Sequence, residues 1–220
     1  MAKTKVAVLI SGRGSNLQSL LDAAAAPDFP AEITLVVSNR PEAAGLERAR
    51  KAGVATGVID HRQYGKGEEG RAAFDAALDK TLRDAGAELV CLAGFMRLLT
   101  PGFVEGWRGR MLNIHPSLLP SFKGLDVHRR MIEAGVKIAG CTVHFVSSEM
   151  DAGPIVGQAA VPVLPGDNPD TLAARILTEE HKLYPACLAL VASGEASLGA
   201  GGVVTLDKAA ASAASLRNPA

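Results

Sequence analysis

The sequence predicts an α/β domain built on a doubly wound, mostly parallel sheet that is Rossmann-like in its N-terminal half and has an antiparallel C-terminal extension. Two observations carry this prediction. Over residues 5–94, short apolar runs rich in β-branched residues alternate with segments of helical periodicity, as in parallel α/β folds. Later, the apolar runs 137–146 and 154–163 follow each other with no helical segment between them, which favours an antiparallel hairpin.

The first half of the chain repeats one strand-helix unit. Strands are expected at 5–11, 32–39, 54–60 and 87–94, and helices at 15–26, 41–53 and 68–86. The first of these strands is apolar almost throughout, as expected for a strand buried on both faces. Leu17, Leu20 and Leu21 fall on one side of the first helix. Pro41 near the start and Gly53 at the end bound the second helix.

The second half departs from this alternation. Strands are expected at 110–115, 137–146 and 154–163, with a short helix at 127–135 and a long one at 168–194. Asp167 or Asn168 stands near the N-cap of the long helix, Pro169 lies in its first turn, and Pro185 is expected to kink it. Residues 1–194 are therefore expected to form one domain. Residues 195–220 are expected to add a short strand at 202–206 and a tail that its composition predicts to be disordered.

Charge and cysteine usage limit the classes of function. The chain has 23 Lys and Arg against 23 Asp and Glu, so no global positive field exists to attract nucleic acid or an anionic membrane. No apolar run is long enough to cross a bilayer, and the apolar run near the N-terminus ends in a glycine-rich turn rather than a cleavage pattern. Three widely spaced cysteines match no zinc or redox spacing. A cytoplasmic protein with free thiols is expected.

The segment "SGRGSN" at 11–16 follows the first strand and precedes the first helix. At this edge of an α/β sheet the free N–H groups of a helix N-terminus favour phosphate. The segment lacks the third glycine and the later acidic residue of a dinucleotide site, and it lacks the Lys-Ser/Thr pair of a P-loop. A phosphate monoester on a small metabolite fits best. The alternative is a tight turn capped by Ser15 or Asn16.

Two polar residues end the apolar strand at 110–115. Asn113 and His115 alternate with Ile114, so their side chains should share one face of the sheet. An amide donor beside an imidazole suits acyl transfer to an amine, since one group can stabilise the developing oxyanion while the other moves protons. Such a reaction needs no protein nucleophile. The alternative is a pair of satisfied polar residues at a strand end.

A carboxylate strengthens the catalytic interpretation. Asp151 lies in "SSEMDAGP", the turn between the two later strands, and a carboxylate near His115 would stabilise its imidazolium form. His144 sits inside a strand, where a hydrogen-bonded structural role is expected. A metal site formed by His115, His128, His144 and Asp151 is the weaker alternative, because the spacings match no known zinc arrangement.

Five segments taken together resemble the phosphoribosylglycinamide formyltransferase family of folate-dependent formyltransferases. They are "LISGRGSNLQSLL", "LAGFMRLLTPGFV", "LNIHPSLLPSFKGLDVH", "GCTVHFVSSEMDAGPIVGQ" and "TEEHKLYP", in order over about residues 5–194. The resemblance implies the formyltransferase fold and an enzyme of purine biosynthesis. Such an enzyme moves a formyl group from 10-formyltetrahydrofolate to the amine of glycinamide ribonucleotide. It further implies no metal, no nucleic acid or membrane partner, and a monomer or weak homodimer.

The resemblance also implies roles for individual residues. Asn113 would bind the formyl oxygen, His115 would act as general acid, and Asp151 would hold His115 protonated and relay protons through water. The ribonucleotide would be held by Gly14, Ser15 and Asn16 at its phosphate and by Glu180 at its ribose. The folate contacts would be Arg71, Met96, Arg97, Leu98, Leu99, Val104, Asn113, Val146, Ser148, Glu149 and Met150. The alternative for the apolar members of this set is ordinary core.

Three departures from the family pattern are visible, at Ala152, Asp126 and Leu177, and only Leu177 puts a contact in doubt, since some members have a polar residue there near the phosphate. Two other functions remain open. A formyltetrahydrofolate hydrolase would pass the formyl group to water and usually carries an additional N-terminal regulatory domain. A non-catalytic binder of folates or sugar phosphates would use the same residues only to position a ligand. A methionyl-tRNA formyltransferase is disfavoured, because it would need a basic C-terminal domain.

Overall fold

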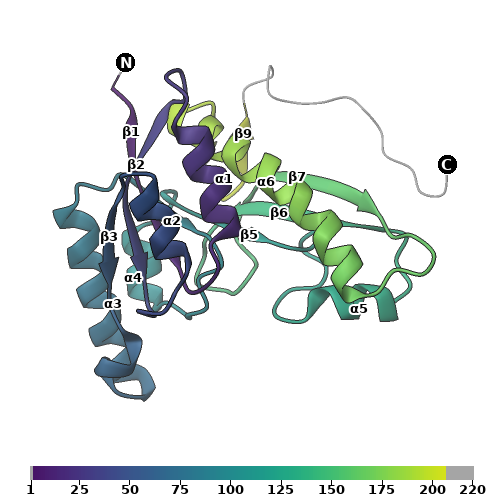
Figure 1. Ribbon diagram of the computed structural model, residues 1–220, viewed down its shortest axis with the longest axis horizontal. Helices are drawn as coiled ribbons and strands as arrows, with labels where there is room; N and C mark the ends of the chain where they lie inside the picture. The colour runs from purple at the N-terminus through teal and green to yellow at the C-terminus, as the bar shows by residue number, and fades with distance from the viewer. Residues whose placement is uncertain (1, 207–220) are drawn as a thin grey trace.

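The computed structural model describes residues 2–206, in which helices cover both faces of a seven-stranded sheet (Figure 1). The sheet strands are β1 (Thr4–Ile10), β2 (Ala31–Ser38), β3 (Ala55–Val58), β4 (Leu89–Leu92), β5 (Met111–His115), β6 (Ile138–Phe145) and β7 (Ile155–Pro162). Their order is β3-β2-β1-β4-β5-β6-β7. The strands from β3 to β5 pair in parallel, and β6 pairs antiparallel with both β5 and β7. The predicted fold class is therefore confirmed.

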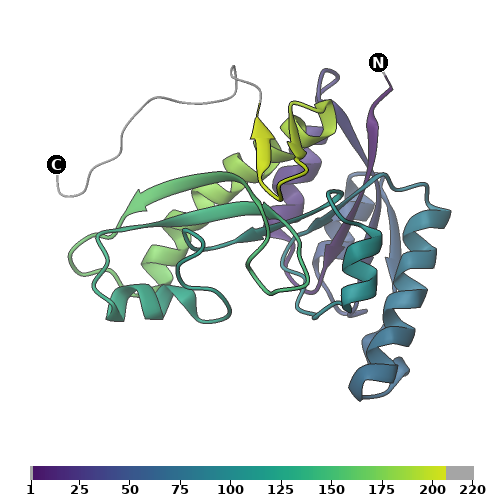
Figure 2. The ribbon, with the colours of Figure 1, turned by 180° about the vertical axis from the view of Figure 1, so that it is seen from behind.

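Side-chain alternation along the strands assigns each helix to a face. Val6 and Val8 point into a core shared with α1 (Ser15–Ala24), α2 (Gly45–Lys51) and α6 (Pro169–Ser193). Ala7 and Leu9 point the other way, toward α3 (Gly67–Asp84) and α4 (Pro101–Gly106), which are nearer the viewer in Figure 2. A third apolar cluster joins α5 (Val127–Glu133) and α6 to β6 and β7. Successive side chains of a strand point to opposite faces of the sheet. Because helices cover both faces here, both sets of side chains are buried, which explains the continuous apolar runs.

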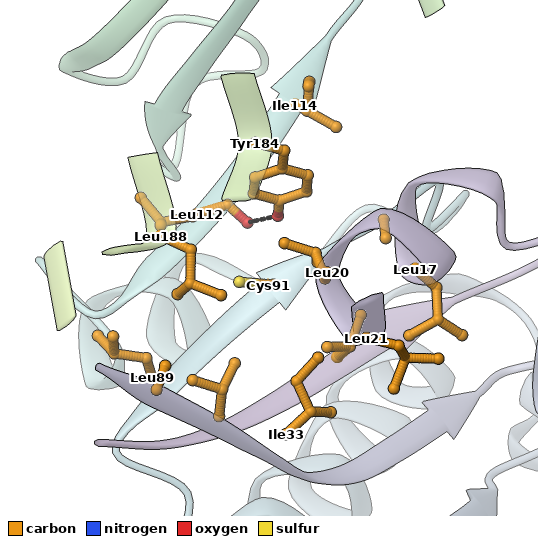
Figure 3. Close-up of a cluster of buried hydrophobic side chains, with 14 of the residues drawn as sticks. Leu17, Leu20, Leu21, Ile33, Leu89, Cys91, Leu112, Ile114, Tyr184 and Leu188 are labelled. Carbon is orange, nitrogen blue, oxygen red and sulfur yellow. Dashed lines mark hydrogen bonds between the residues drawn. The ribbon is translucent and has the colours of Figure 1, made fainter. Parts of the chain in front are cut away.

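The core on the α1 and α6 side fixes the long helix against the strands that carry the site (Figure 3). The Tyr184 hydroxyl of α6 is fully buried and lies 3.1 Å from the carbonyl oxygens of both Leu92 and Leu112. Its hydrogen bond satisfies a polar group that would be costly to bury alone. Leu17, Leu20 and Leu21 of α1 pack into the same core, as their spacing predicted.

Some element boundaries differ from the prediction. The helix expected at 41–53 begins at Gly45, because residues 40–43 form a turn in which Ala43 N–H donates to the Arg40 carbonyl. The sequence did not predict the 3-10 turn η1 (His61–Tyr64), helix α4 or strand β8 (Ala196–Leu198). The helix α6 continues through Pro185 as one element, and Asn168 caps it by accepting from the N–H groups of Asp170 and Thr171.

The segment after α6 forms a small hairpin. Strand β9 (Val204–Leu206), expected at 202–206, pairs antiparallel with β8. The tail predicted to be disordered lies from residue 207 onward, outside the described residues. Within residues 2–206, no helix is long and apolar enough to cross a membrane. Cys91, Cys141 and Cys187 are buried and free, as predicted.

Candidate active site

The end of β5 presents Asn113 and His115 on the same face of the sheet. Met111, two residues earlier, packs into the core beside α3 and α4, whereas Leu112 and Ile114 pack into the opposite core. The alternation predicted from the sequence therefore holds. The half-buried amide of Asn113 and the buried imidazole of His115 stand where the apolar core on that face ends.

His115 meets Asp151, as the sequence predicted. Its Nδ1 lies 3.4 Å from Asp151 Oδ2, and its Nε2 lies 2.9 Å from the carbonyl oxygen of Phe122. Both ring nitrogens thus face oxygen acceptors, which a doubly protonated imidazolium can satisfy with its two N–H groups. Asp151 Oδ2 also accepts from the N–H of Gly124 at 2.8 Å, which fixes the carboxylate beside the ring.

Two loops hold this arrangement. Phe122 and Asp151 both adopt left-handed backbone conformations, with φ of 56° and 50°. Lys123 Nζ lies 2.8 Å from Glu149 Oε1 and so joins the two loops by an ion pair. Arg130 of α5 donates to the Lys123 carbonyl at 2.6 Å. The acceptors around His115 are therefore set by contacts between the two loops and by α5.

Asn113 has one recorded side-chain partner among the described residues. Its Nδ2 lies 3.2 Å from Nε2 of His144, the residue directly opposite it on β6. His144 is 3% exposed, and its Nδ1 lies 2.9 Å from the Phe145 carbonyl oxygen. The Asn113 amide is therefore held on one side, while its remaining hydrogen-bonding capacity is open to a ligand.

The glycine loop presents free N–H groups at the start of α1. Gly14 is the N-cap with φ of 72°, and no side chain caps the helix, so the alternative of a turn capped by Ser15 or Asn16 does not describe this loop. The N–H groups of the first turn lack intrahelical partners and can bind an anion. A Cβ on Gly14 would lie 2.8 Å from the Cα of Gly45, which explains why glycine is needed here.

Asn16 and Glu180 meet at the same place. Asn16 Nδ2 donates to Glu180 Oε2 at 2.6 Å, while Asn16 Oδ1 is buried without a partner. Burial raises the pKa of the Glu180 carboxyl, an effect that the Asn16 hydrogen bond and the His115 charge oppose. Three of the four predicted ribonucleotide residues lie in one loop, and the fourth is bonded to it.

Most of the predicted folate residues fall into two segments, and Arg71, Val104 and Asn113 lie outside them. Residues 96–99 follow β4, and residues 146–150 belong to the loop that carries Asp151. Met96, Leu98 and Met150 are exposed by 64%, 58% and 54%, so apolar surface is available beside the loops. Val104 is buried in the core beside α3, as its alternative interpretation as ordinary core requires. Arg71 lies on α3 and makes no hydrogen bond or ion pair with Asn113, His115 or Asp151.

Other features lie apart from these residues. A hollow of about 460 Å³ beside α1 and α6 includes Ser15, Arg48 and His181, and it shares only Ser15 with the predicted site. We place the candidate site at Asn113, His115 and Asp151, because none of these three residues lines the hollow. Within residues 2–206, no group of three or more His, Cys, Asp or Glu could hold a metal ion.

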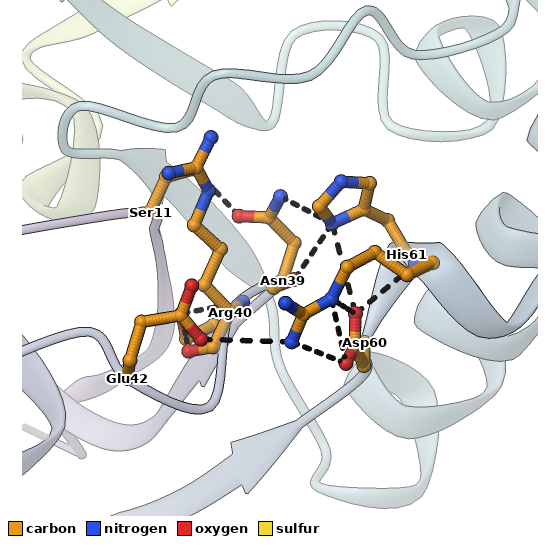
Figure 4. A network of polar contacts seen from close by, with 8 residues as sticks. Ser11, Asn39, Arg40, Glu42, Asp60 and His61 are labelled. Carbon is orange, nitrogen blue, oxygen red and sulfur yellow. Dashed lines mark hydrogen bonds and ion pairs between the residues drawn. The ribbon is translucent and has the colours of Figure 1, made fainter.

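A second polar network lies at the ends of β1, β2 and β3 (Figure 4). Ser11 Oγ donates to Asn39 Oδ1 at 2.6 Å, and Asn39 Nδ2 lies 3.1 Å from Nδ1 of His61. Asp60 beside His61 binds Arg62, and this ion pair lowers the pKa of Asp60 to about 2. In contrast to the half-buried Asn113, Asn39 is 1% exposed, with its Oδ1 bonded to Ser11 and its Nδ2 enclosed beside the His61 ring.

Three contributors to the site were missed by the sequence analysis. The Phe122 carbonyl and Gly45 carry no pattern of their own, since each acts through its backbone position. His144 was noticed, but a hydrogen-bonded structural role was expected, with a metal ligand as the weaker alternative. Its place opposite Asn113 would follow from the strand register, which residue periodicity does not give.

The fold and the site define a formyl transferase. The formyl transferase family model matches residues 4–188, and the chain belongs to this family. The phosphoribosylglycinamide formyltransferase of Escherichia coli is 45% identical over 189 residues, which are 86% of this chain and 87% of that protein. The family prediction is therefore confirmed.

Other relatives extend the comparison. The crystal structure of glycinamide ribonucleotide transformylase 1 from Symbiobacterium toebii superposes with a TM-score of 0.88 at 48% identity, covering 93% of this chain and 95% of that one. The trifunctional purine biosynthetic protein adenosine-3 of Gallus gallus is 53% identical over 202 residues. These are 92% of this chain, which spans only 20% of the length of that protein.

Proposed function

We propose that this enzyme transfers the formyl group of 10-formyltetrahydrofolate to the amine of glycinamide ribonucleotide in purine biosynthesis. The observation that carries the proposal is the His115 and Asp151 pair beside Asn113, in a chain that covers most of a phosphoribosylglycinamide formyltransferase. The products are formylglycinamide ribonucleotide and tetrahydrofolate.

The residues divide the chemistry between them. The substrate amine attacks the formyl carbon, and the carbonyl oxygen becomes an oxyanion that the free N–H of Asn113 stabilises. The leaving folate nitrogen takes a proton from His115, and the proton lost by the attacking amine passes through water and Asp151 back to His115, so the site returns to its starting state. Asp151 stabilises the positive charge on His115 before transfer. Because His115 Nε2 faces the Phe122 carbonyl, delivery from this nitrogen exchanges that hydrogen bond for one to the substrate.

The two substrates approach from different segments. The phosphate binds at the N–H groups of Gly14, Ser15 and Asn16, and Glu180 accepts from the ribose hydroxyls. The folate lies along residues 96–99 and 146–150. Arg71 contributes from the folate side. The protein works in the cytoplasm as a monomer or weak homodimer.

The test follows the loss of 10-formyltetrahydrofolate by absorbance, with and without glycinamide ribonucleotide and in the presence of a metal chelator. Turnover that needs the ribonucleotide and is unaffected by the chelator supports the proposal. Turnover without the ribonucleotide indicates a hydrolase instead. No turnover in either case indicates a binding protein.

A further inference from the structure

The hydrogen bonds of His144 define its protonation state. Nδ1 faces the Phe145 carbonyl oxygen at 2.9 Å, and a carbonyl can only accept, so Nδ1 carries a proton. Burial lowers the pKa of His144. The Phe145 hydrogen bond and the Asp151 carboxylate oppose this effect, and the His115 charge adds to it. The ring is thus neutral, with an unprotonated Nε2.

An unprotonated Nε2 determines how the Asn113 amide is turned. The partner of Nε2 at 3.2 Å must be a donor, so Asn113 presents Nδ2 rather than Oδ1 to His144. An amide nitrogen has two N–H groups. One is used by His144, and the second is directed away from it as a donor.

The backbone at Gly153 packs against His144 and helps to fix its position. A Cβ on Gly153 would lie 1.7 Å from the Phe145 carbonyl oxygen and 3.3 Å from Nδ1 of His144, so the chain after Asp151 packs directly against this pair. The register of β6 against β7 shifts between Val143 and His144, which marks a local irregularity at this residue. Close packing of this backbone and the hydrogen bond to the Phe145 carbonyl therefore hold the ring in place.

We infer that His144 is a positioning residue that holds the Asn113 amide with an N–H, and not its oxygen, toward the formyl oxygen. A reversed amide would aim Oδ1 at the developing oxyanion and repel it. The inference rests on the proposed formyl transfer and assigns to a buried histidine the orientation of the oxyanion donor.

The first test determines the tautomer directly in the unmodified protein. Long-range ¹H–¹⁵N spectra of the ¹⁵N-labelled chain at neutral pH should show His144 with a protonated Nδ1 and an unprotonated Nε2. A proton on Nε2 would overturn the inference, whatever reaction the enzyme catalyses. This measurement depends neither on a variant that folds nor on activity.

The second test uses His144→Leu and His144→Gln. Losing an aligned oxyanion donor should lower kcat on the order of tenfold or more in His144→Leu while KM changes little. His144→Gln should recover most of kcat, because its side-chain oxygen can accept from Asn113 Nδ2. An unchanged kcat in His144→Leu, or no recovery in His144→Gln at equal stability, would contradict the inference.

A double-mutant cycle separates positioning from general damage. In an Asn113→Ala background, His144→Leu should have no further effect on kcat beyond about twofold, since the group it positions is gone. Independent, multiplying effects would show that His144 acts otherwise. His61→Leu is the matched control, because it removes a histidine from the other Asn–His pair and should leave kcat within about twofold. Absence of formyl transfer in the wild-type enzyme would instead contradict the proposed function.

Discussion

The enzyme contains two Asn–His pairs at strand ends, and they differ in what remains free. Asn39 is bonded through its oxygen to Ser11 and lies beside His61 through its nitrogen, within a buried network (Figure 4). Asn113 is bonded to His144 by its nitrogen alone and is half-buried. A fully buried amide is out of reach of a substrate, whereas a half-buried amide held on one side can offer a hydrogen bond to one. Exposure of the amide therefore distinguishes the pair that we propose to be catalytic from the buried pair.

The largest expected effect is the loss of turnover when His115, beside the half-buried Asn113, is replaced. His115→Ala should lower kcat on the order of a hundredfold or more, because it removes the proposed general acid, while 10-formyltetrahydrofolate still binds. Steady-state kinetics and a folate-binding titration measure the two effects. His61→Ala, which removes the histidine beside Asn39, should leave kcat nearly unchanged. Equal losses in the two variants would remove the distinction between the pairs.

The second prediction concerns the glycine loop at residues 11–16 and the binding of glycinamide ribonucleotide. Gly14→Ala introduces a Cβ at φ of 72° and 2.8 Å from Gly45, so the loop must shift. We expect KM for glycinamide ribonucleotide to rise about tenfold while KM for the folate changes little, since we propose that the loop N–H groups bind the phosphate. Gly53→Ala is a control with the same sign of φ and open space around it. A rise in both KM values would argue against a phosphate loop.

Loss of the buried network of Ser11, Asn39 and His61 should lower stability rather than activity. Asn39→Ala leaves the Ser11 hydroxyl without its acceptor and removes a partner of His61. The free energy of unfolding should fall by about 1–3 kcal/mol, measured by urea denaturation, with kcat of the folded fraction retained. A large loss of kcat with unchanged stability would place Asn39 in the active site.

The smallest effect concerns pH. Burial lowers the pKa of His144 and of His128 below the ordinary 6.5. Between the folded and unfolded pKa values the unfolded chain binds more protons, so stability is full above about pH 6.5 and declines as the pH falls below it. Urea denaturation at several pH values should show this decline, and His144→Gln should make it shallower. A variant with the same slope as wild type would mean that His144 does not titrate on unfolding.

The sequence predicted those features of the fold and the site that depend on local periodicity. Alternation along residues 111–115 placed Asn113 and His115 on one face, and strand-helix alternation predicted the parallel sheet. The pairing of Asn113 with His144 could not be predicted, because it depends on the register of two strands 31 residues apart. The Phe122 carbonyl also escaped prediction, since its position depends on one left-handed residue in a loop.

The boundary errors have local causes. Pro41 and the alanines after it favour a helix start, but the turn at residues 40–43 delays α2 to Gly45, which packs against the glycine loop. Helix α4 is only six residues long, and its Thr100 cap and Pro101 follow a loop with no clear period. Short elements of this kind are set by tertiary contacts rather than by propensity.

The proposed role of the Asn113 amide is tested by kcat for formyl transfer in Asn113→Ala and Asn39→Ala, measured in one assay at saturating substrates. We predict that Asn113→Ala loses about a hundredfold in kcat, as expected for removal of an oxyanion donor, and that Asn39→Ala retains nearly all of it. Comparable values of kcat in the two variants would contradict the claim that the open amide at the end of β5 takes part in catalysis.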